Sequence, residues 1–445
     1  MDPSIPGGGL CVSDKSLVTS GTGANLYKYC GRQAGPSQKL VLAPRAGISF
    51  SPVNKWVLRT GYGIFFDTAE TFEDIGSGNI YPYTIRSTLV AVAGQNLINA
   101  DNLFPVLSAP GPVTPADLSF YEPQSQKRFD PYVQNWSLSV EHEIFKGTKA
   151  EVYYAGSKGT HLNSRGTSNQ PFDYDPSNPL PPTARLPYPN FGLIVEEFWT
   201  AYSKYDSLNA KVESNVGNLN VVAAYTWAKS MDNKSAAASI GGDAAGWAGP
   251  MDFHRPQLDY AVSSYDIPQR FVGSFNYKLP IGRGQRVLSQ SNAVVDAFVG
   301  GWQANGIVSF QSGFPFTVTA PDLDSYNSAY GQRANLVGKP YPNGFHRTTA
   351  EWFNTAAFTQ PALGMYGTSP RNFLRGQGEN NLDASVFKTT HLGEPLALEL
   401  RLEAFNALNR VTFAFPDSNW ADSTFGVVRG AAPGRIVQLG AKLIW

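Results

Sequence analysis

Hydrophobic and polar residues alternate along the last stretch of the chain, 435–445, which reads R-I-V-Q-L-G-A-K-L-I-W. Successive side chains of a β-strand point to opposite faces. One face of this stretch is apolar and ends in an aromatic ring, and the other carries an amide, a glycine and an ammonium group. Such a strand can cross a membrane as part of a β-barrel, and it can equally lie half-buried in a soluble sandwich. The two alternatives are distinguished by whether the pattern recurs along the chain, with loops of the right kind between the strands.

The same alternation recurs along most of the chain. It predicts eleven strands, at 45–50, 56–66, 135–144, 149–154, 208–213, 219–227, 271–279, 302–310, 382–387, 396–403 and 435–445. Short turns alternate with long polar connections such as 67–131, 157–203 and 230–268, and a basic linker of moderate length follows 271–279. Bacterial membrane barrels have long loops outside the cell and short turns in the periplasm, whereas soluble sandwiches have no reason to sort loops by length. The sequence therefore predicts an all-β, antiparallel transmembrane β-barrel portion with meander topology.

Composition agrees with an all-β chain. Aromatic residues make up 13% of the sequence, charged residues only 16%, and there are 43 glycines and 32 prolines. Basic and acidic residues balance at 35 each, so the charge indicates no nucleic-acid partner. No apolar run is long enough for a membrane helix. The first residues have neither the basic segment nor the apolar core of a signal peptide.

Residues 1–44 show no usable periodicity and are predicted to be a loop-rich N-terminal segment before the partial barrel at 45–445. Cys11 and Cys30 are the only cysteines. They could close one disulfide in an oxidising compartment, or remain two unpaired thiols.

The number of predicted strands restricts how the barrel can close. In a closed antiparallel barrel the first and last strands run in opposite directions, but the first and eleventh strands of this series run in the same direction. Either one strand has been missed or the barrel continues upstream of residue 1. Because no export signal is present, we expect the second, with the chain forming about half of a larger barrel.

Eight stretches together resemble one family. They are A-P-R-A-G-I-S-F-S-P (43–52), L-R-T-G-Y-G-I-F-F-D (58–67), P-Y-V-Q-N-W-S-L-S-V-E-H-E (131–143), Y-A-G-S-K-G-T-H-L (154–162), G-W-Q-A-N-G-I-V-S-F-Q-S-G-F-P-F (301–316), W-F-N-T-A-A-F (352–358), N-F-L-R-G-Q-G-E-N-N-L-D-A-S-V-F-K (372–388) and R-L-E-A-F-N-A-L-N-R (401–410). These stretches are similar to the Oar-like TonB-dependent receptors common in Acidobacteria. The similarity covers residues 42–445.

The resemblance implies an outer-membrane transporter with a barrel of about 22 strands. Its partners would be outer-membrane lipid, a plug domain in the lumen, the TonB energy-coupling system and the barrel assembly machinery. No stretch of this sequence resembles a plug, a coupling box or the carboxypeptidase-regulatory-like domain of the family. The chain is therefore expected to be the C-terminal half of a barrel that takes up or exports an unidentified solute. The alternative is a soluble or surface β-sandwich that binds carbohydrate through its aromatic side chains.

No residue pattern indicates an enzyme, a cofactor or a metal site. Gly156-Ser157-Lys158-Gly159 lacks the spacing of a nucleophile elbow and is predicted to be a strand-end turn. Asp322, Asp324 and Asn327 lack the ligand series of a calcium loop and are expected to be solvated.

Charged residues on the polar faces are predicted to line the lumen and to form a salt-bridge ladder against a plug. They are Arg59, Lys211, Glu213, Glu399, Arg401, Glu403 and Lys442. The last strand resembles the closing strand of bacterial outer-membrane barrels, in which Leu439, Gly440, Leu443 and Trp445 would serve barrel assembly.

Overall fold

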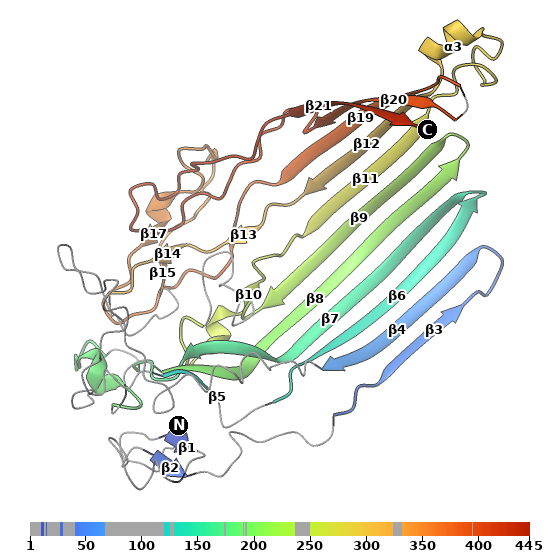
Figure 1. Ribbon diagram of the computed structural model, residues 1–445. Coiled ribbons are helices and arrows are strands. Elements are labelled where there is room, and N and C mark those ends of the chain that lie inside the picture. The colour runs from blue at the N-terminus through green and yellow to red at the C-terminus, as the bar shows by residue number, and fades with distance from the viewer. Residues whose placement is uncertain are drawn as a thin grey trace, which may run out of the picture.

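One large sheet dominates the computed structural model, which describes residues 10–12, 15, 27–29, 41–66, 120–124, 129–172, 175–189, 191, 194–235, 250–323, 332–393 and 395–445. The sheet has thirteen strands. Eleven follow one another in the order β3-β4-β6-β7-β8-β9-β11-β12-β19-β20-β21, and β5 and β10 pair beside this path. Figure 1 shows these eleven strands lying side by side in a single layer.

Each strand of the path contains or overlaps one of the strands expected from alternation. They are β3 (Arg45–Phe50), β4 (Trp56–Phe66), β6 (Tyr132–Phe145), β7 (Thr148–Thr167), β8 (Ile194–Val216), β9 (Leu219–Asp232), β11 (Gln269–Lys278), β12 (Trp302–Gln311), β19 (Glu379–His391), β20 (Ala397–Phe405) and β21 (Ile436–Ile444). The predicted antiparallel, all-β fold is confirmed.

The register of the sheet joins the predicted apolar positions into one continuous face, hereafter the apolar face. Direct cross-strand partners form rows such as Thr60, Leu138, Tyr154, Leu208 and Trp227. Leu138 and Leu208 remain 47% and 46% exposed, and Trp227 remains 60% exposed. In a sandwich a second sheet about 10 Å away would bury such residues. Among the described residues no second large sheet does so.

The opposite face of the same strands, hereafter the polar face, carries mainly amide, hydroxyl and charged side chains. Every pairing along the path is antiparallel. Because eleven strands alternate in direction, the two edge strands β3 and β21 run the same way, as the parity argument expects. The described sheet is open at these two edges.

Short connections gather at one end of the strands and long ones at the other (Figure 1). The short-turn end has connections at 51–55, 146–147, 217–218 and 392–396. The same end holds the longer connection 279–301, which contains helix α3 (Ala293–Val299). Within the described ranges, no helix combines the length and apolar character that crossing a membrane would require.

The expectation that 157–203 is a long loop is wrong. Strand β7 continues to Thr167 and β8 begins at Ile194, so the two pair far beyond the predicted end. Gly156 is therefore inside a strand rather than in a turn, and a Cβ there would lie 2.2 Å from the Trp136 ring. Apolar alternation marks only part of these two strands. Beyond that part, backbone hydrogen bonds still pair the strands although their side chains show no alternating pattern.

The structure adds short elements to two further segments. The N-terminal segment contains two short parallel strands, β1 (Leu10–Val12) and β2 (Tyr27–Tyr29), although most of it lies outside the described residues. The basic linker after β11 contains α3, which is too short for helical periodicity to reveal.

A compact hydrophobic cluster lies at the long-loop end and is hereafter called the loop cap. It is built from the connections 312–378 and 406–435, which contribute Phe316, Val318, Trp352, Phe353, Phe358, Leu374 and Val428 among its buried residues. The cap includes β13 (Pro315–Phe316), β14 (Thr319–Ala320), β15 (Gln332–Arg333), β16 (Asn335–Leu336), β17 (Phe358–Thr359), β18 (Leu374–Arg375) and the 3-10 helix η6 (Thr355–Ala357). Burial of its apolar surface gives this end of the molecule a core of its own.

Other short elements complete the long-loop end. They are β5 (Phe120–Gln124), β10 (Ala261–Val262), and the 3-10 helices η4 (Pro182–Arg185) and η5 (Pro256–Asp259). Strand β5 pairs with β8 in parallel, and β10 pairs with the end of β9.

Candidate functional site

A chain of alternating charges crosses the polar face near the short-turn end. Glu141 Oε2 lies 3.0 Å from Arg59 Nη1, and Glu141 Oε1 lies 3.3 Å from Lys149 Nζ. Lys149 is the cross-strand partner of Glu213, whose carboxylate forms an ion pair with Lys211. These residues come from β4, β6, β7 and β8, so the structure brings Arg59, Lys211 and Glu213 onto one surface. Each exposed pair contributes only about 0–1 kcal/mol.

A second group of charges lies on the polar face of β20 and β21. Arg401 Nε donates to Glu399 Oε1 at 2.6 Å, and the guanidinium lies 4.9 Å from the centre of the Phe387 ring. Lys442 is the cross-strand partner of Glu399, and Glu403 is opposite Gln438. All four predicted charged residues of these strands therefore share one face.

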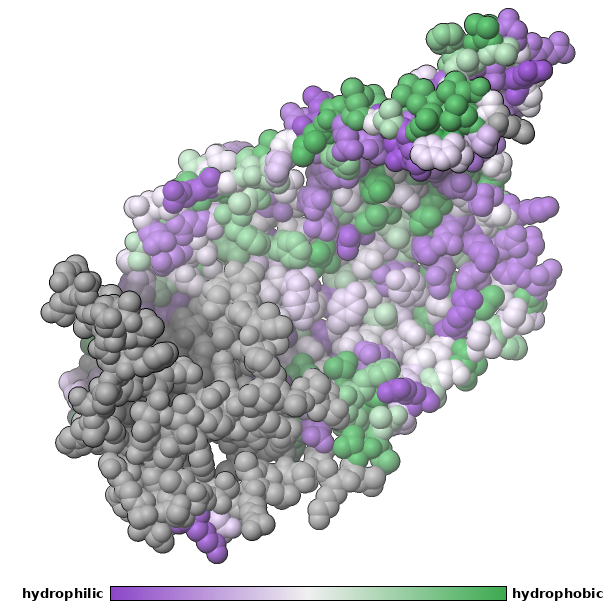
Figure 2. Space-filling model, in the orientation of Figure 1, coloured by the Kyte–Doolittle hydropathy of each residue, from purple (hydrophilic) through white to green (hydrophobic). Residues whose placement is uncertain are grey.

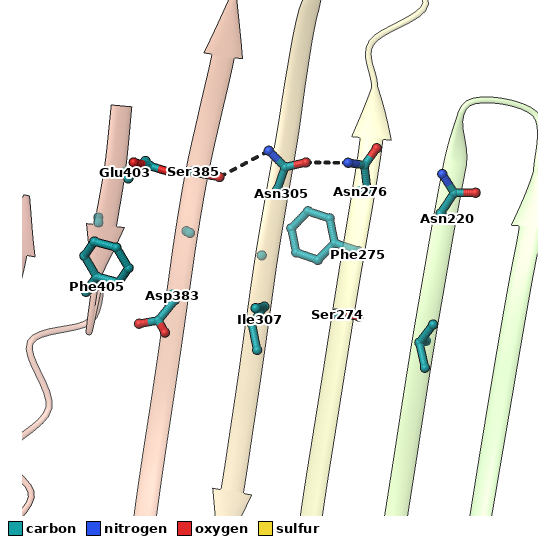
Figure 3. A pocket seen from close by; sticks show the side chains of 14 residues that line it. Asn220, Ser274, Phe275, Asn276, Asn305, Ile307, Asp383, Ser385, Glu403 and Phe405 are labelled. Carbon is teal, nitrogen blue, oxygen red and sulfur yellow. Dashed lines mark hydrogen bonds between the residues drawn. The ribbon is translucent and has the colours of Figure 1, made fainter. Parts of the chain in front are cut away.

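Between the two charged groups a row of polar side chains crosses five strands, hereafter the polar row. Glu403, Ser385, Asn305, Asn276 and Asn220 are successive cross-strand partners on β20, β19, β12, β11 and β9. Figure 3 shows these side chains in line on the same face.

Hydrogen bonds order the centre of the polar row. Asn276 Nδ2 donates to Asn305 Oδ1 at 2.7 Å, and Asn305 Nδ2 donates to Ser385 Oγ at 3.1 Å. The row borders a shallow hollow of about 400 Å³, into which the carboxylate of Asp383 also faces. Such a surface can exchange hydrogen bonds with a polar solute or with a polar protein segment.

Three ion pairs with buried carboxylates join the loop cap to the end of β9 and to the connection between β9 and β11, and no sequence pattern predicted them. They join Arg371 to Asp232, Arg333 to Asp259, and Arg375 to Asp266. Asp232 ends β9 in register with the polar face. The pair between Arg371 and Asp232 therefore holds the cap on the polar side of the long-loop end. The partners are far apart in sequence, so spacing alone offers no signal for them.

The first of these pairs is the most connected. Arg371 Nη2 donates to the Asp232 backbone oxygen at 2.7 Å, Nε donates to Asp259 O at 2.9 Å, and Nη1 reaches Ser235 Oγ at 3.1 Å. Burial raises the pKa of the Asp259 carboxyl, while the Arg333 and Arg371 guanidiniums oppose that shift. One arginine thus links a β12–β19 loop to β9 and to η5.

Two histidines stack on aromatic rings of neighbouring residues. His142 stacks on Trp56 with ring centres 4.1 Å apart, and His161 stacks on Phe129 at 4.5 Å. No group of three or more potential metal ligands occurs in the described part of the chain. Cys30, one of the two cysteines that could form a disulfide or remain unpaired, lies outside the described residues, as do Asp324 and Asn327 of the acidic loop.

The closing strand β21 forms one edge of the sheet. Leu439 and Trp445 are 80% and 84% exposed, and Leu443 is 48% exposed. Gly440 lies opposite Arg401, on the polar face. A row of unpaired backbone groups at such an edge favours pairing with another strand.

A family model described as an outer membrane beta barrel domain matches residues 3–438, which is nearly the whole chain. The chain belongs to this outer-membrane β-barrel family. Membership places it in the outer membrane and agrees with the single-layered sheet and its sorted loops. No curated protein matches the chain.

Solved outer-membrane transporters have a similar fold. The outer membrane transporter YddB from Escherichia coli is 10% identical, with a TM-score of 0.45, and the match covers 87% of this chain and 38% of that one. The FrpB iron transporter from Neisseria meningitidis is 10% identical, with a TM-score of 0.39 and coverage of 90% and 38%. The ferric-catecholate import receptor Fiu from E. coli is 8% identical, with a TM-score of 0.40 and coverage of 90% and 34%. The chain thus spans less than two fifths of the length of each, and none of the three is described as an enzyme.

Proposed function

We propose that the chain forms part of the wall of a TonB-dependent receptor of the Oar-like type, which moves a solute across the outer membrane. The observation that carries the proposal is the separation of the sheet into an apolar and a polar face over eleven strands. In a barrel wall the apolar face meets lipid and the polar face lines the lumen. Family membership supports the outer-membrane location, and the sequence stretches quoted above favour the receptor type.

Closure of the barrel requires strands beyond the eleven described. Unpaired backbone groups cost several kcal/mol each in hydrocarbon. Because β3 and β21 run in the same direction, they cannot pair with each other in the antiparallel manner of the other strands. We infer that further strands of the same protein lie between these edges and complete a barrel of about 22 strands.

In this proposal the two groups of charges on the polar face and the polar row have different roles in the lumen. The groups around Glu141 and Arg401 face a plug domain, whose movement depends on the TonB system. The polar row borders the path of the solute, and the loop cap lies over the mouth of that path. In the same proposal β21 is the strand that the barrel assembly machinery recognises, through Leu439, Gly440, Leu443 and Trp445.

A matched pair of substitutions on β12 tests the proposed transport. Asn305→Leu removes two hydrogen bonds of the polar row, while Ala304→Leu changes the adjacent position on the apolar face, opposite Tyr277 and Val386. Solutes in the medium are compared by mass spectrometry among a deletion strain, a complemented strain and the two variants.

We expect the complemented strain and Ala304→Leu to deplete or secrete at least one solute that the deletion strain does not. Asn305→Leu should reduce that transfer although the protein still reaches the outer membrane. Collapse of the proton-motive force should abolish the transfer if TonB drives it. A deletion strain with an unchanged solute profile would contradict the proposed transport.

The alternative, a soluble or surface β-sandwich that binds carbohydrate, has less support. A sandwich requires two sheets whose inner faces interdigitate. The described path strands form one sheet, and large aromatic side chains of its apolar face such as Trp227 remain exposed instead of packing against a second sheet.

A further inference from the structure

The connection between β11 and β12 forms a folded projection at the short-turn end, hereafter the foot (281–300). Its helix α3 begins after Asn292, whose Oδ1 accepts a hydrogen bond from Val295 N at 2.8 Å. Asp296 Oδ1 accepts from Arg283 N at 2.6 Å and so ties the preceding loop, 281–289, to the helix. An isolated parallel β-bridge between Ile281 and Val287 closes that loop. The foot is thus an ordered structure and not an open loop.

Three side-chain hydrogen bonds hold the foot on the apolar side of the sheet. Trp302 Nε1 donates to Phe298 O at 2.9 Å, and Lys388 Nζ donates to Gly300 O at 2.5 Å. Thr390 Oγ1 donates to Ala297 O at 3.4 Å.

All three donors belong to the apolar face. Trp302 and Lys388 are cross-strand partners, and Thr390 lies opposite Leu398 on the same face. The foot therefore continues the apolar face beyond the end of the strands.

The helix exposes apolar side chains that nothing in the described chain covers. Phe298 is 74% exposed and Val294 is 70% exposed, and residues four apart lie on the same side of a helix. Val287 and Leu288 of the loop before the helix are 48% and 51% exposed. Figure 2 shows apolar surface at this tip of the molecule, next to hydrophilic residues.

The charge of the foot complements an anionic surface. Arg283 and Arg286 are exposed on the loop before the helix. Asp296 is the only acidic residue of the connection, and its Oδ1 atom already accepts from the Arg283 backbone. A short helix with an apolar side and adjacent basic residues is typical of a segment that lies in a membrane interface.

We propose that the foot binds the periplasmic leaflet of the outer membrane. Phe298 and Val294 enter the acyl chains, while Arg283 and Arg286 contact the phosphates of anionic phospholipid. Continuity with the apolar face argues for lipid rather than for a protein partner. The inference rests on the proposed assignment of that face to lipid, which the experiment below examines separately.

The experiment places an environment-sensitive fluorophore at single cysteines of the full-length protein, with Cys11 and Cys30 replaced by serine. The labelled variants are Phe298→Cys in the foot, Asn218→Cys in the short turn between β8 and β9, and Leu402→Cys on the apolar face. Outer membranes that contain each variant are doped with phosphatidylglycerol or phosphatidylcholine carrying a nitroxide in the acyl chain. Fluorescence emission and quenching are then recorded.

The expected result is blue-shifted, quenched emission at positions 298 and 402 and water-like, unquenched emission at position 218. Water-like emission at 298 with quenching at 402 would overturn the foot proposal alone. Absence of quenching at both 298 and 402 would overturn the foot and the lipid-facing assignment together. Emission at 298 that is blue-shifted but insensitive to both nitroxide lipids would indicate a protein partner and would also overturn the proposal.

A second comparison tests the role of the arginines. At position 298 the nitroxide on phosphatidylglycerol should quench more strongly than the same nitroxide on phosphatidylcholine, because the arginines gather anionic lipid around the foot. Arg283→Gln with Arg286→Gln should remove that difference and leave quenching at 402 unchanged. A preference for phosphatidylglycerol that persists in the double variant would contradict the arginine–phosphate contact.

Discussion

Replacement of Ala223 by arginine should prevent most of the protein from folding into the membrane, whereas arginine at the adjacent Val222 should be tolerated. Ala223 lies on the apolar face of β9, opposite Val212 and Gly273. Val222 lies on the polar face, opposite Glu213 and Ser274. The hydropathy of the native residues alone would predict the reverse order, because valine is the larger apolar side chain. The two substitutions therefore test which face each residue lies on and not the hydropathy of the residue that is replaced.

The two substitutions are expected to change the free energy of folding by very different amounts. Arginine on the lipid-facing side near the middle of the membrane costs about 2–4 kcal/mol. Since about 1.4 kcal/mol is a factor of ten, Ala223→Arg should lower the folding equilibrium about 30- to 700-fold. At position 222 the new guanidinium lies opposite the exposed carboxylate of Glu213, where an ion pair contributes about 0–1 kcal/mol. Val222→Arg should thus change stability by about 1 kcal/mol at most.

The assay measures how much of the intact gene product is recovered, folded, in the outer-membrane fraction of cells. Heat-modifiable migration in gels distinguishes folded from unfolded barrel. The account predicts strong loss for Ala223→Arg and near-normal recovery for Val222→Arg. Equal recovery of the two variants, or the reverse order, would refute the assignment of faces.

Further predictions concern the loop cap and the sheet edges. Asp232→Asn removes the charge partner of buried Arg371 and should cost about 3–5 kcal/mol, seen as faster proteolysis of the loop region; unchanged protection would show that the pair does not hold the cap. Burial raises the pKa of Tyr341, and its hydroxyl has no hydrogen-bond partner among the described residues. Ionisation of Tyr341 therefore leaves the stability of the cap unchanged below the unfolded pKa of about 10. Stability is lost as the pH rises through the folded pKa of Tyr341. Tyr341→Phe should stabilise the cap by about 1 kcal/mol and weaken its alkaline unfolding; a thermal-unfolding transition that is lower than wild type would contradict this. The isolated chain, refolded into phospholipid vesicles, should aggregate through β3 and β21 rather than form a closed channel; steady single-channel conductance from a protease-resistant monomer would refute this.

The fold was predictable because lipid imposes a strict rule on each membrane strand. Positions such as Leu382 and Val386 alternate with Asp383 and Ser385, and the structure places each set on one face. The extension of β7 and β8 past residue 157 was not predictable, because hydrophobic and polar side chains do not alternate there although the backbones pair. The seven charged residues predicted on polar faces do share those faces, but their assignment to a lumen remains a proposal.

The polar row and the loop cap show where sequence patterns carry no information. Asn276, Asn305 and Ser385 were recognisable as polar-face residues, yet their alignment depends on the register between strands. The pair between Arg371 and Asp232 joins segments more than a hundred residues apart, with a separation of 139. No local periodicity records such a contact, and it follows only from the tertiary arrangement.

Fractionation of cells tests the central claim, that this chain is part of an outer-membrane barrel wall, most directly. Cells that express the intact gene product are lysed without detergent, and the membranes are separated from the soluble proteins by ultracentrifugation. The account predicts that the protein sediments with the outer membrane and is released only by detergent. Recovery of folded protein in the supernatant would contradict the barrel-wall account and would favour a soluble β-protein instead.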